Sequence, residues 1–156
     1  MRLWVRVFTV VNVFLYQLTR GILGSNMGGQ SMLLLYTTGR KSGKTHVIPI
    51  SYFRDGENYI LVASNWGRSF HPDWYHNLLS KPEAEIQVKW HKLLACAHPA
   101  SAEEYDRLWN YVIRRNAIYM HYQRHTRRKI PVVILEPISQ VLADGFAEQP
   151  RSSAQR

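Results

Sequence analysis

The stretch TTGRKSGKTH, residues 37–46, combines two glycines with three cationic side chains. It is close to a phosphate-binding Walker A loop, which has four residues between its glycines and opens a helix. Here three residues separate Gly39 from Gly43, and the run that follows is β-branched and aromatic and contains Pro49. Proline in that position disfavours a helix. The sequence therefore predicts a loop between two strands, which either binds an anion or forms only a polar turn.

Two tyrosines are a second candidate for chemistry. Tyr119 and Tyr122 are three residues apart in a segment that we expect to be helical, so both phenols lie on one side of the helix. They are either packed core residues or the wall of a substrate pocket, where a phenol can stack on a ligand and donate a hydrogen bond.

Metal and nucleophile chemistry have weaker support in the sequence. His121 and His125 have i, i+4 spacing, but no glutamate follows the first histidine, and Cys96 is the single cysteine. We predict no metal site. The chain has no Gly-x-Ser-x-Gly motif, and its adjacent Glu103 and Glu104 have the position of first-turn helix charges.

The composition restricts the class of protein. The 156 residues include 20 Lys and Arg against 11 Asp and Glu, a formal charge of +9. Such a charge predicts an anionic partner: a nucleic acid, a membrane surface, or a phosphorylated or carboxylated ligand. The length fits one domain that buries a core without a disulfide, and the single cysteine fits a reducing, cytoplasmic compartment.

The basic run Arg124–Lys129 is the densest cluster of charge. It can grip nucleic acid, but no known recognition motif surrounds it and it leads directly into an apolar run. We interpret it as a solvated junction and expect no nucleic-acid partner.

Residues 1–23 have the pattern of an amphipathic helix, with Arg2, Arg6 and Arg20 on a polar stripe beside a wide apolar face. The segment is too polar for a membrane span and lacks the cleavage site of a signal peptide. A helix of this type lies in a membrane interface, here the inner face of the membrane, or packs on protein. A hinge rich in Gly and Ser follows over residues 24–31.

Apolar runs bounded by turn residues predict about six mostly antiparallel strands with helices packed outside. The predicted strands are residues 32–38, 46–54, 57–64, 85–90, 93–98 and 130–136. The predicted helices are residues 72–80, 101–115 and 118–124, the second opening on a capping box. We expect an α+β fold built on a small antiparallel barrel over residues 32–138, and a disordered tail over residues 139–156.

Three separated segments together resemble the deazaflavin-dependent nitroreductase family. They are TTGRKSGKTHVIPI, VASNWGRSFHPDWYHNL and IYMHYQRHTRRKIPVVILEP, and the resemblance runs from about Leu33 to Pro137. Members of that family have a split β-barrel fold like that of FMN-binding oxidoreductases, and they bind coenzyme F420, a deazaflavin with a phosphate and an oligoglutamate tail. The chain departs from the family pattern at His46, Ile48 and Asn116, the last standing where a third tyrosine is expected.

The resemblance implies a coenzyme site. The residues that would bind the anionic part of F420 or lie at its entrance are Arg40, Lys41, Ser42, Gly43, Lys44 and His46. The residues that would border or cover the deazaflavin ring are Pro49, Ile50, Ser51, Ala63, Ser64, Asn65, Asp73 and Trp74. Tyr119 and Tyr122 would face the acceptor.

The implied activity is hydride transfer from reduced F420 to an electrophilic acceptor. A quinone is the expected acceptor, because the N-terminal helix would hold the domain where lipid quinones partition; nitroaromatics and activated enones are further candidates. A phenol of Tyr119 or Tyr122 would donate a proton or orient the acceptor oxygen. Small barrels of this kind often form homodimers.

Two alternatives stay open from the residues alone. The first is the same barrel with FMN or haem, because a basic loop serves any phosphate. The second is a non-enzymatic basic protein that binds membrane surfaces or nucleic acid, which would bind with a steep dependence on salt.

Overall fold

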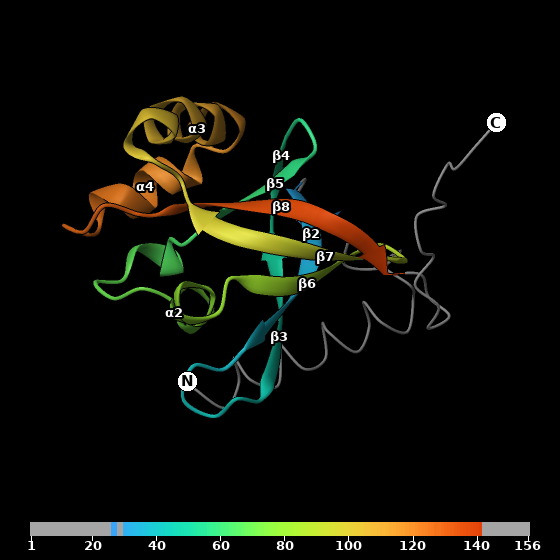
Figure 1. Ribbon diagram of the computed structural model, residues 1–156. Coiled ribbons are helices and arrows are strands. Elements are labelled where there is room, and N and C mark those ends of the chain that lie inside the picture. Colours follow the sequence, from blue (N-terminus) through green and yellow to red (C-terminus); the bar gives the residue numbers. More distant parts are fainter. Residues whose placement is uncertain (1–25, 28–29, 142–156) are drawn as a thin grey trace.

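The computed structural model describes residues 26–27 and 30–141, which form an antiparallel sheet flanked by helices (Figure 1). The strands are β1 (Asn26–Met27), β2 (Gln30–Thr38), β3 (Thr45–Ser51), β4 (Phe53–Asp55), β5 (Asn58–Val62), β6 (Glu83–Val88), β7 (His91–Pro99) and β8 (Val132–Val141). The helices are the 3₁₀ turn η1 (Asn65–Gly67), α2 (Asp73–Ser80), α3 (Ala102–Arg115) and α4 (Ile118–Arg124). The amphipathic helix predicted over residues 1–23 lies outside the described residues.

The sheet has the strand order β1-β2-β6-β7-β8-β5-β4, and β3 pairs with β2 off this path. β3 and β4 belong to opposite ends of this ladder, yet only Tyr52 separates them along the chain. The sheet therefore curls until its two ends meet through one residue. Among the described strands no hydrogen-bonded pairing joins β3 to β4 or β5, so the sheet is not closed. The predicted α+β class and antiparallel pairing are confirmed, and a closed barrel is not found.

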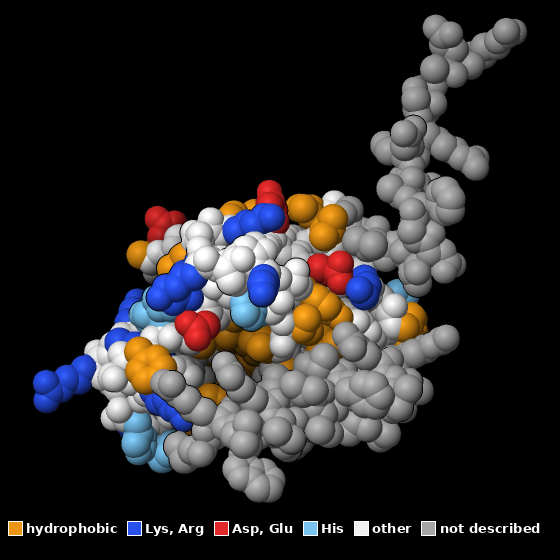
Figure 2. Space-filling model, turned by 90° about the horizontal axis from the view of Figure 1, so that it is seen from below, with side chains coloured by type: hydrophobic (Ala, Val, Ile, Leu, Met, Phe, Trp, Pro, Cys, Tyr) orange, Lys and Arg blue, Asp and Glu red, His pale blue; other side chains and the backbone are white. Residues whose placement is uncertain are grey.

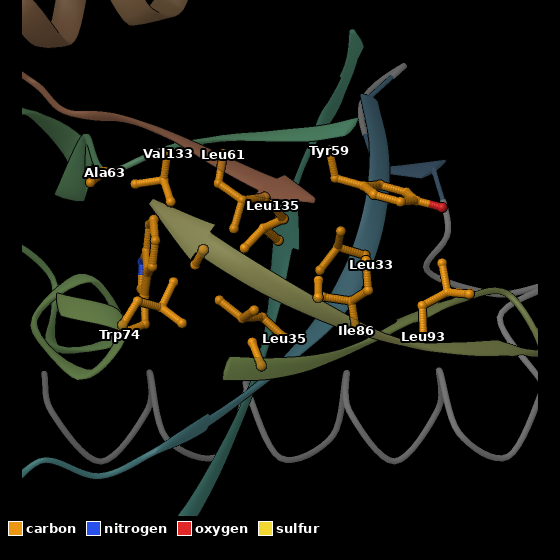
Figure 3. Close-up of a cluster of buried hydrophobic side chains, with 14 residues drawn as sticks. Leu33, Leu35, Tyr59, Leu61, Ala63, Trp74, Ile86, Leu93, Val133 and Leu135 are labelled. Atoms are coloured by element: carbon orange, nitrogen blue, oxygen red, sulfur yellow. The ribbon is translucent and has the colours of Figure 1, made fainter. Parts of the chain in front are cut away.

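Two hydrophobic clusters lie on opposite faces of β8. Side chains alternate across a strand, so Val133 and Leu135 enter the first cluster while Val132 and Ile134 enter the second. The first cluster fills the inside of the curled sheet, and the indole of Trp74 from α2 reaches into it (Figure 3). The second lies between the sheet and the pair α3 and α4. The predicted packing of helices outside the sheet holds for α3 and α4.

The helix α3 begins and ends at the residues that the sequence predicts. The Ser101 side chain accepts a hydrogen bond from the Glu104 N–H, and the Glu104 carboxylate accepts one from the Ser101 N–H, so the predicted capping box is confirmed. α3 ends at Arg115, as predicted. None of the described helices is long and apolar enough to cross a membrane.

The structure differs from the predicted strands in three ways that go beyond shifts of a few residues at their ends. The strand predicted over residues 46–54 is two strands, because β3 pairs with β2 and the chain then turns at Tyr52 to pair β4 with β5. With β1, which was not predicted, the described residues contain eight strands rather than about six. β8 continues three residues into the predicted tail, where Val141 pairs with Lys92. The predicted hinge contains β1 and the first residues of β2, which pair with each other.

The position of Pro49 fits the edge character of β3. Among the described strands β3 pairs with β2 alone, so one of its edges has no partner strand. Proline has no N–H to donate to a ladder and is tolerated in a strand that is unpaired on one side.

Two tyrosine hydroxyls provide a matched test of the second cluster. The Tyr105 hydroxyl donates to the Ile130 carbonyl over 2.9 Å in the interior, and burial raises the pKa of Tyr105 to about 12. The Tyr111 hydroxyl donates to the Arg54 carbonyl over 2.6 Å at the surface. We expect Tyr105→Phe to lower the free energy of unfolding by about 1–3 kcal/mol, because the buried carbonyl loses its donor. Tyr111→Phe should cost less than about 1 kcal/mol, because water replaces the hydroxyl. Urea denaturation measures both free energies of unfolding. Equal losses in the two variants would contradict a buried hydrogen bond of Tyr105 and an exposed one of Tyr111.

Candidate functional site

The loop between β2 and β3 is a tightly bonded turn. The Gly39 N–H donates to the Lys44 carbonyl and the Gly43 N–H donates to the Gly39 carbonyl, both over 2.8 Å. Gly43 has φ of +65°, in the left-handed region that favours glycine. A Cβ on Gly39 would lie 2.6 Å from both the Ser42 Oγ and the His46 Nε2. The two glycines therefore set the shape of the loop, and side chains project outward from it.

Arg40 attaches this loop to α2. Its backbone N–H donates to Asn77 Oδ1 over 3.1 Å, and both terminal nitrogens of its guanidinium lie 3.2 Å from Asp73 Oδ1. Asn77 is 5% exposed, and its Nδ2 donates to the Thr37 Oγ1 over 3.2 Å. The structure thus brings two predicted site residues together, Arg40 and Asp73, but as partners of each other. The Asp73 side chain stays 89% exposed and that of Arg40 is 31% exposed.

Lys41 and Lys44 are the cations that the loop presents to solvent. Both are exposed, and within the described part of the chain neither forms an ion pair with a carboxylate. Ser42 completes the turn, since its Oγ accepts from the Lys44 N–H over 3.3 Å and lies 3.4 Å from the His46 Nε2. The sequence predicted these residues as one anion-binding group, and the structure keeps them adjacent.

The residues predicted to border a flat ring have unequal access to solvent. Pro49, Ile50 and Ser51 are half-buried along β3, beside its unpaired edge. Ala63 and Trp74 are buried in the first hydrophobic cluster, where Trp74 is 8% exposed (Figure 3). Trp74 therefore packs in the core, and only Asp73 of the pair predicted to cover the ring stands at the surface.

The turn η1 carries the remaining predicted ring residues. Ser64 is buried, and Asn65, which is half-buried, begins η1 with φ of +48°. Gly67 lies against α4, because a Cβ on it would be 2.8 Å from the Tyr122 carbonyl oxygen. The end of η1 thus lies beside the helix that carries the two predicted tyrosines.

Tyr119 and Tyr122 differ in environment. Tyr119 is 7% exposed, with ring centroids 5.8 Å from Phe53 and 6.0 Å from Tyr122. Burial, with a smaller effect of Tyr122, raises the pKa of Tyr119 to about 12, against the opposing effect of a hydrogen bond with the Ser51 side chain. The phenol therefore keeps its proton at neutral pH. Tyr122 is half-buried and is the more accessible of the two.

Arg128 lies beside the candidate site, although the sequence did not predict this. The basic run was interpreted as a solvated junction, which is wrong for Arg128. Its guanidinium is half-buried and donates to the carbonyl oxygens of Ala63, Ser64 and Arg68 over 3.0, 2.7 and 2.9 Å. Carbonyl partners carry no residue signature, so the sequence offers no signal for this contact.

Other parts of the described surface are less suited to a site. Two concavities, of about 520 Å³ beside Thr38 and Thr45 and about 540 Å³ along α3, are lined by none of the predicted site residues. Among residues 26–27 and 30–141 no group of three or more His, Cys, Asp or Glu side chains is arranged to hold a metal. On the face shown in Figure 2, Lys and Arg are scattered among Asp and Glu and form no continuous basic patch of the kind that nucleic acid needs.

Comparison with known proteins identifies the family. Residues 5–137 match the F420H(2)-dependent quinone reductases, which is most of the chain. The chain belongs to this family. An F420H(2)-dependent quinone reductase of Mycobacterium tuberculosis is 40% identical over 125 residues, which cover 78% of this chain and 84% of that protein. The resemblance inferred from the three sequence segments is thereby confirmed.

Solved structures agree with this membership. A structure described as an F420-H2 dependent reductase, FDR-A, has a TM-score of 0.62 and 34% sequence identity, and the match covers 67% of this chain and 93% of that one. A second, described as a domain-swapped dimer, has a TM-score of 0.66 and 32% identity, and covers 85% of this chain and 97% of that one.

Asn77 tests whether the loop is anchored to α2. We expect Asn77→Ala to lower the free energy of unfolding by about 1–3 kcal/mol, because the buried Thr37 hydroxyl and the Arg40 N–H both lose their partner. Ser80→Ala, at an exposed position of the same helix, is the control and should change stability by less than about 0.5 kcal/mol. Urea denaturation measures both. Equal stability of Asn77→Ala and the wild type would contradict the anchor.

Proposed function

We propose that this protein transfers a hydride from reduced coenzyme F420 to a quinone, using a domain of the split β-barrel type. The observation that carries the proposal is the loop between β2 and β3. It presents Lys41 and Lys44 at the surface beside the half-exposed apolar residues of β3. The chain belongs to the F420H(2)-dependent quinone reductase family, which supports F420 as the ligand of this loop and a quinone as the acceptor.

The donor set of the loop fits the anionic part of the coenzyme. Two exposed ammonium groups, with the Ser42 hydroxyl beside them, suit phosphate and carboxylate oxygens. Arg40 contributes indirectly by fixing the loop on α2, and Asp73 competes with any anion for that guanidinium. We therefore assign the direct electrostatic contacts to Lys41 and Lys44, with His46 at the end of the loop.

The apolar part of the coenzyme fits beside β3. Pro49 and Ile50 are half-buried on a strand that pairs along one edge alone among the described strands, and the Ser51 hydroxyl donates to the Met32 Sδ. Ala63, Ser64 and Asn65 would form the other border, through backbone groups where the side chain is buried. When bound, reduced F420 supplies the hydride. The protein has to position the acceptor and restrict water around it.

Tyr122 is the residue we assign to the acceptor. It is half-buried and lies 6.0 Å, ring to ring, from the buried Tyr119. A phenol at this place would donate a hydrogen bond to a quinone oxygen and supply a proton as the quinone is reduced. Tyr119, whose ring packs against those of Phe53 and Tyr122, would support the position of Tyr122.

The enzyme would also associate with the membrane and with a second copy of the chain. An amphipathic segment over residues 1–23 would place the enzyme at the inner face of the membrane, where quinones dissolve. A homodimer is in keeping with the related structure described as a domain-swapped dimer. FMN is the alternative coenzyme, because the loop offers the same donors to its phosphate.

The coenzyme assignment is tested by fluorescence titration with F420 and, separately, with FMN. We expect F420 to bind much more tightly than FMN. Lys41→Ala and Lys44→Ala should each weaken F420 binding by about 1 kcal/mol or more at low salt, because each removes a charge-assisted contact. Arg114→Ala removes an exposed charge from α3 and is the control. Tighter binding of FMN would replace the coenzyme, and unchanged F420 affinity in both lysine variants would remove the loop from the site.

The role of Tyr122 is tested by Tyr122→Phe. We expect kcat with a soluble naphthoquinone to fall at least about tenfold, because the donor to the acceptor oxygen is lost, while the Kd for F420 stays unchanged. Tyr111→Phe, which removes a hydroxyl bonded to the Arg54 carbonyl, is the control and should retain full turnover. Wild-type kcat in Tyr122→Phe would make this tyrosine a packing residue.

A further inference from the structure

Arg128 joins both sides of the segment that runs from β5 to α2. Its Nη2 donates to the Ala63 and Ser64 carbonyl oxygens, where the segment begins, over 3.0 and 2.7 Å. Its Nε donates to the Arg68 carbonyl over 2.9 Å, and its Nη1 lies 2.9 Å from the His71 Nδ1, two residues before α2. One guanidinium therefore contacts four groups spread over residues 63–71.

The backbone conformation of residues 63–71 requires contacts that stabilise it. Asn65 and Trp66 have φ of +48° and +54°, a region that residues other than glycine rarely adopt. Conformations of this kind persist when surrounding contacts hold them. Besides Arg128, the Asn65 Nδ2 donates to the Phe70 carbonyl over 3.1 Å. Trp66 and Phe70 are both largely exposed, so neither side chain anchors the segment in the core.

The contact between Arg128 and His71 depends on protonation. Arginine donates hydrogen bonds and accepts none, so the His71 Nδ1 must be unprotonated to accept. The other titratable groups facing His71 are Tyr75 and His76 of α2, with ring centroids 5.0 and 5.7 Å away. Burial, then the charge of Arg128 and then that of His76 lower the pKa of His71 below its ordinary value of 6.5.

We propose that Arg128 and His71 are a positioning pair that holds residues 63–71 in the shape required for coenzyme binding, and that protonation of His71 releases this segment. The inference rests on the proposed function, because it takes Ala63, Ser64, Asn65 and Asp73 as the coenzyme border on either side of the tie. Neither Arg128 nor His71 needs to touch the coenzyme.

The sign of the pH dependence follows from the lowered pKa. The folded segment favours neutral His71, so its stabilisation is complete above the ordinary value of 6.5. It is lost progressively as the pH falls below that value towards the lowered pKa. Affinity for the coenzyme should fall over the same interval.

Two variants test the hydrogen bonds of Arg128 and the titration of His71 separately. Arg128→Lys keeps the positive charge but loses the planar fork that reaches several acceptors at once. His71→Asn keeps an acceptor near the position of Nδ1 and removes the titrating group. The matched controls are Arg127→Lys, at the exposed neighbouring position, and His91→Asn, at the start of β7.

Two measurements are made on the full chain between about pH 5 and pH 8. Amide hydrogen exchange of residues 63–71, without coenzyme and corrected for intrinsic rates, reports whether the segment is held. Fluorescence titration gives the Kd for F420. Because the ligand is the same for every variant, its own titration cancels in the ratio of Kd values.

We expect exchange in this segment to quicken at least about tenfold in Arg128→Lys, with a loss of F420 affinity of at least about tenfold. Wild-type protection and affinity should fall below pH 6.5, and His71→Asn should show a flatter profile in both. Wild-type behaviour of both variants would overturn the inference, as would faster exchange with unchanged affinity. If the wild type binds no F420, the proposed function fails and the coenzyme role of the pair with it, while exchange still decides whether the pair holds the segment.

Discussion

The burial of the first four residues of β8 on both faces of the strand is the constraint on which the rest of the structure depends. Val132, Val133, Ile134 and Leu135 are each 3% exposed or less, because alternate side chains enter different clusters. A strand of this kind needs a layer on each side. The curled sheet with α2 provides one layer, and α3 with α4 provides the other. Pairing of β8 with β5 and β7 then fixes where the segments of the candidate site emerge.

The site lies at the borders of this core and is held by polar contacts. Asn77 and Arg40 fix the basic loop on α2, and Arg128 connects the segment after β5 to His71, just before α2. Each contact joins elements that are distant in sequence. These contacts hold the loops of the candidate site on the core.

The division of cations in the loop illustrates how context changes a residue's role. Arg40, Lys41 and Lys44 have similar charges in the sequence, but Arg40 faces Asp73 while the two lysines face solvent. Arginine suits the anchoring role because its planar fork reaches a carboxylate with two nitrogens. The lysines form no ion pair within the described residues and are exposed to a ligand. Charge alone would have assigned all three to the same task.

The sequence by itself determined the α+β class, the antiparallel strands, the capped α3, the basic loop and the family, since each of these depends on residue type and spacing along a short stretch. Only the tertiary structure decided that residues 46–54 form two strands, that Trp74 is a core residue, and that Arg128 binds the segment after β5. These features depend on partners far away in the chain, and those of Arg128 are mainly backbone carbonyls. Because every residue carries such a carbonyl, no local sequence pattern can predict the contacts of Arg128.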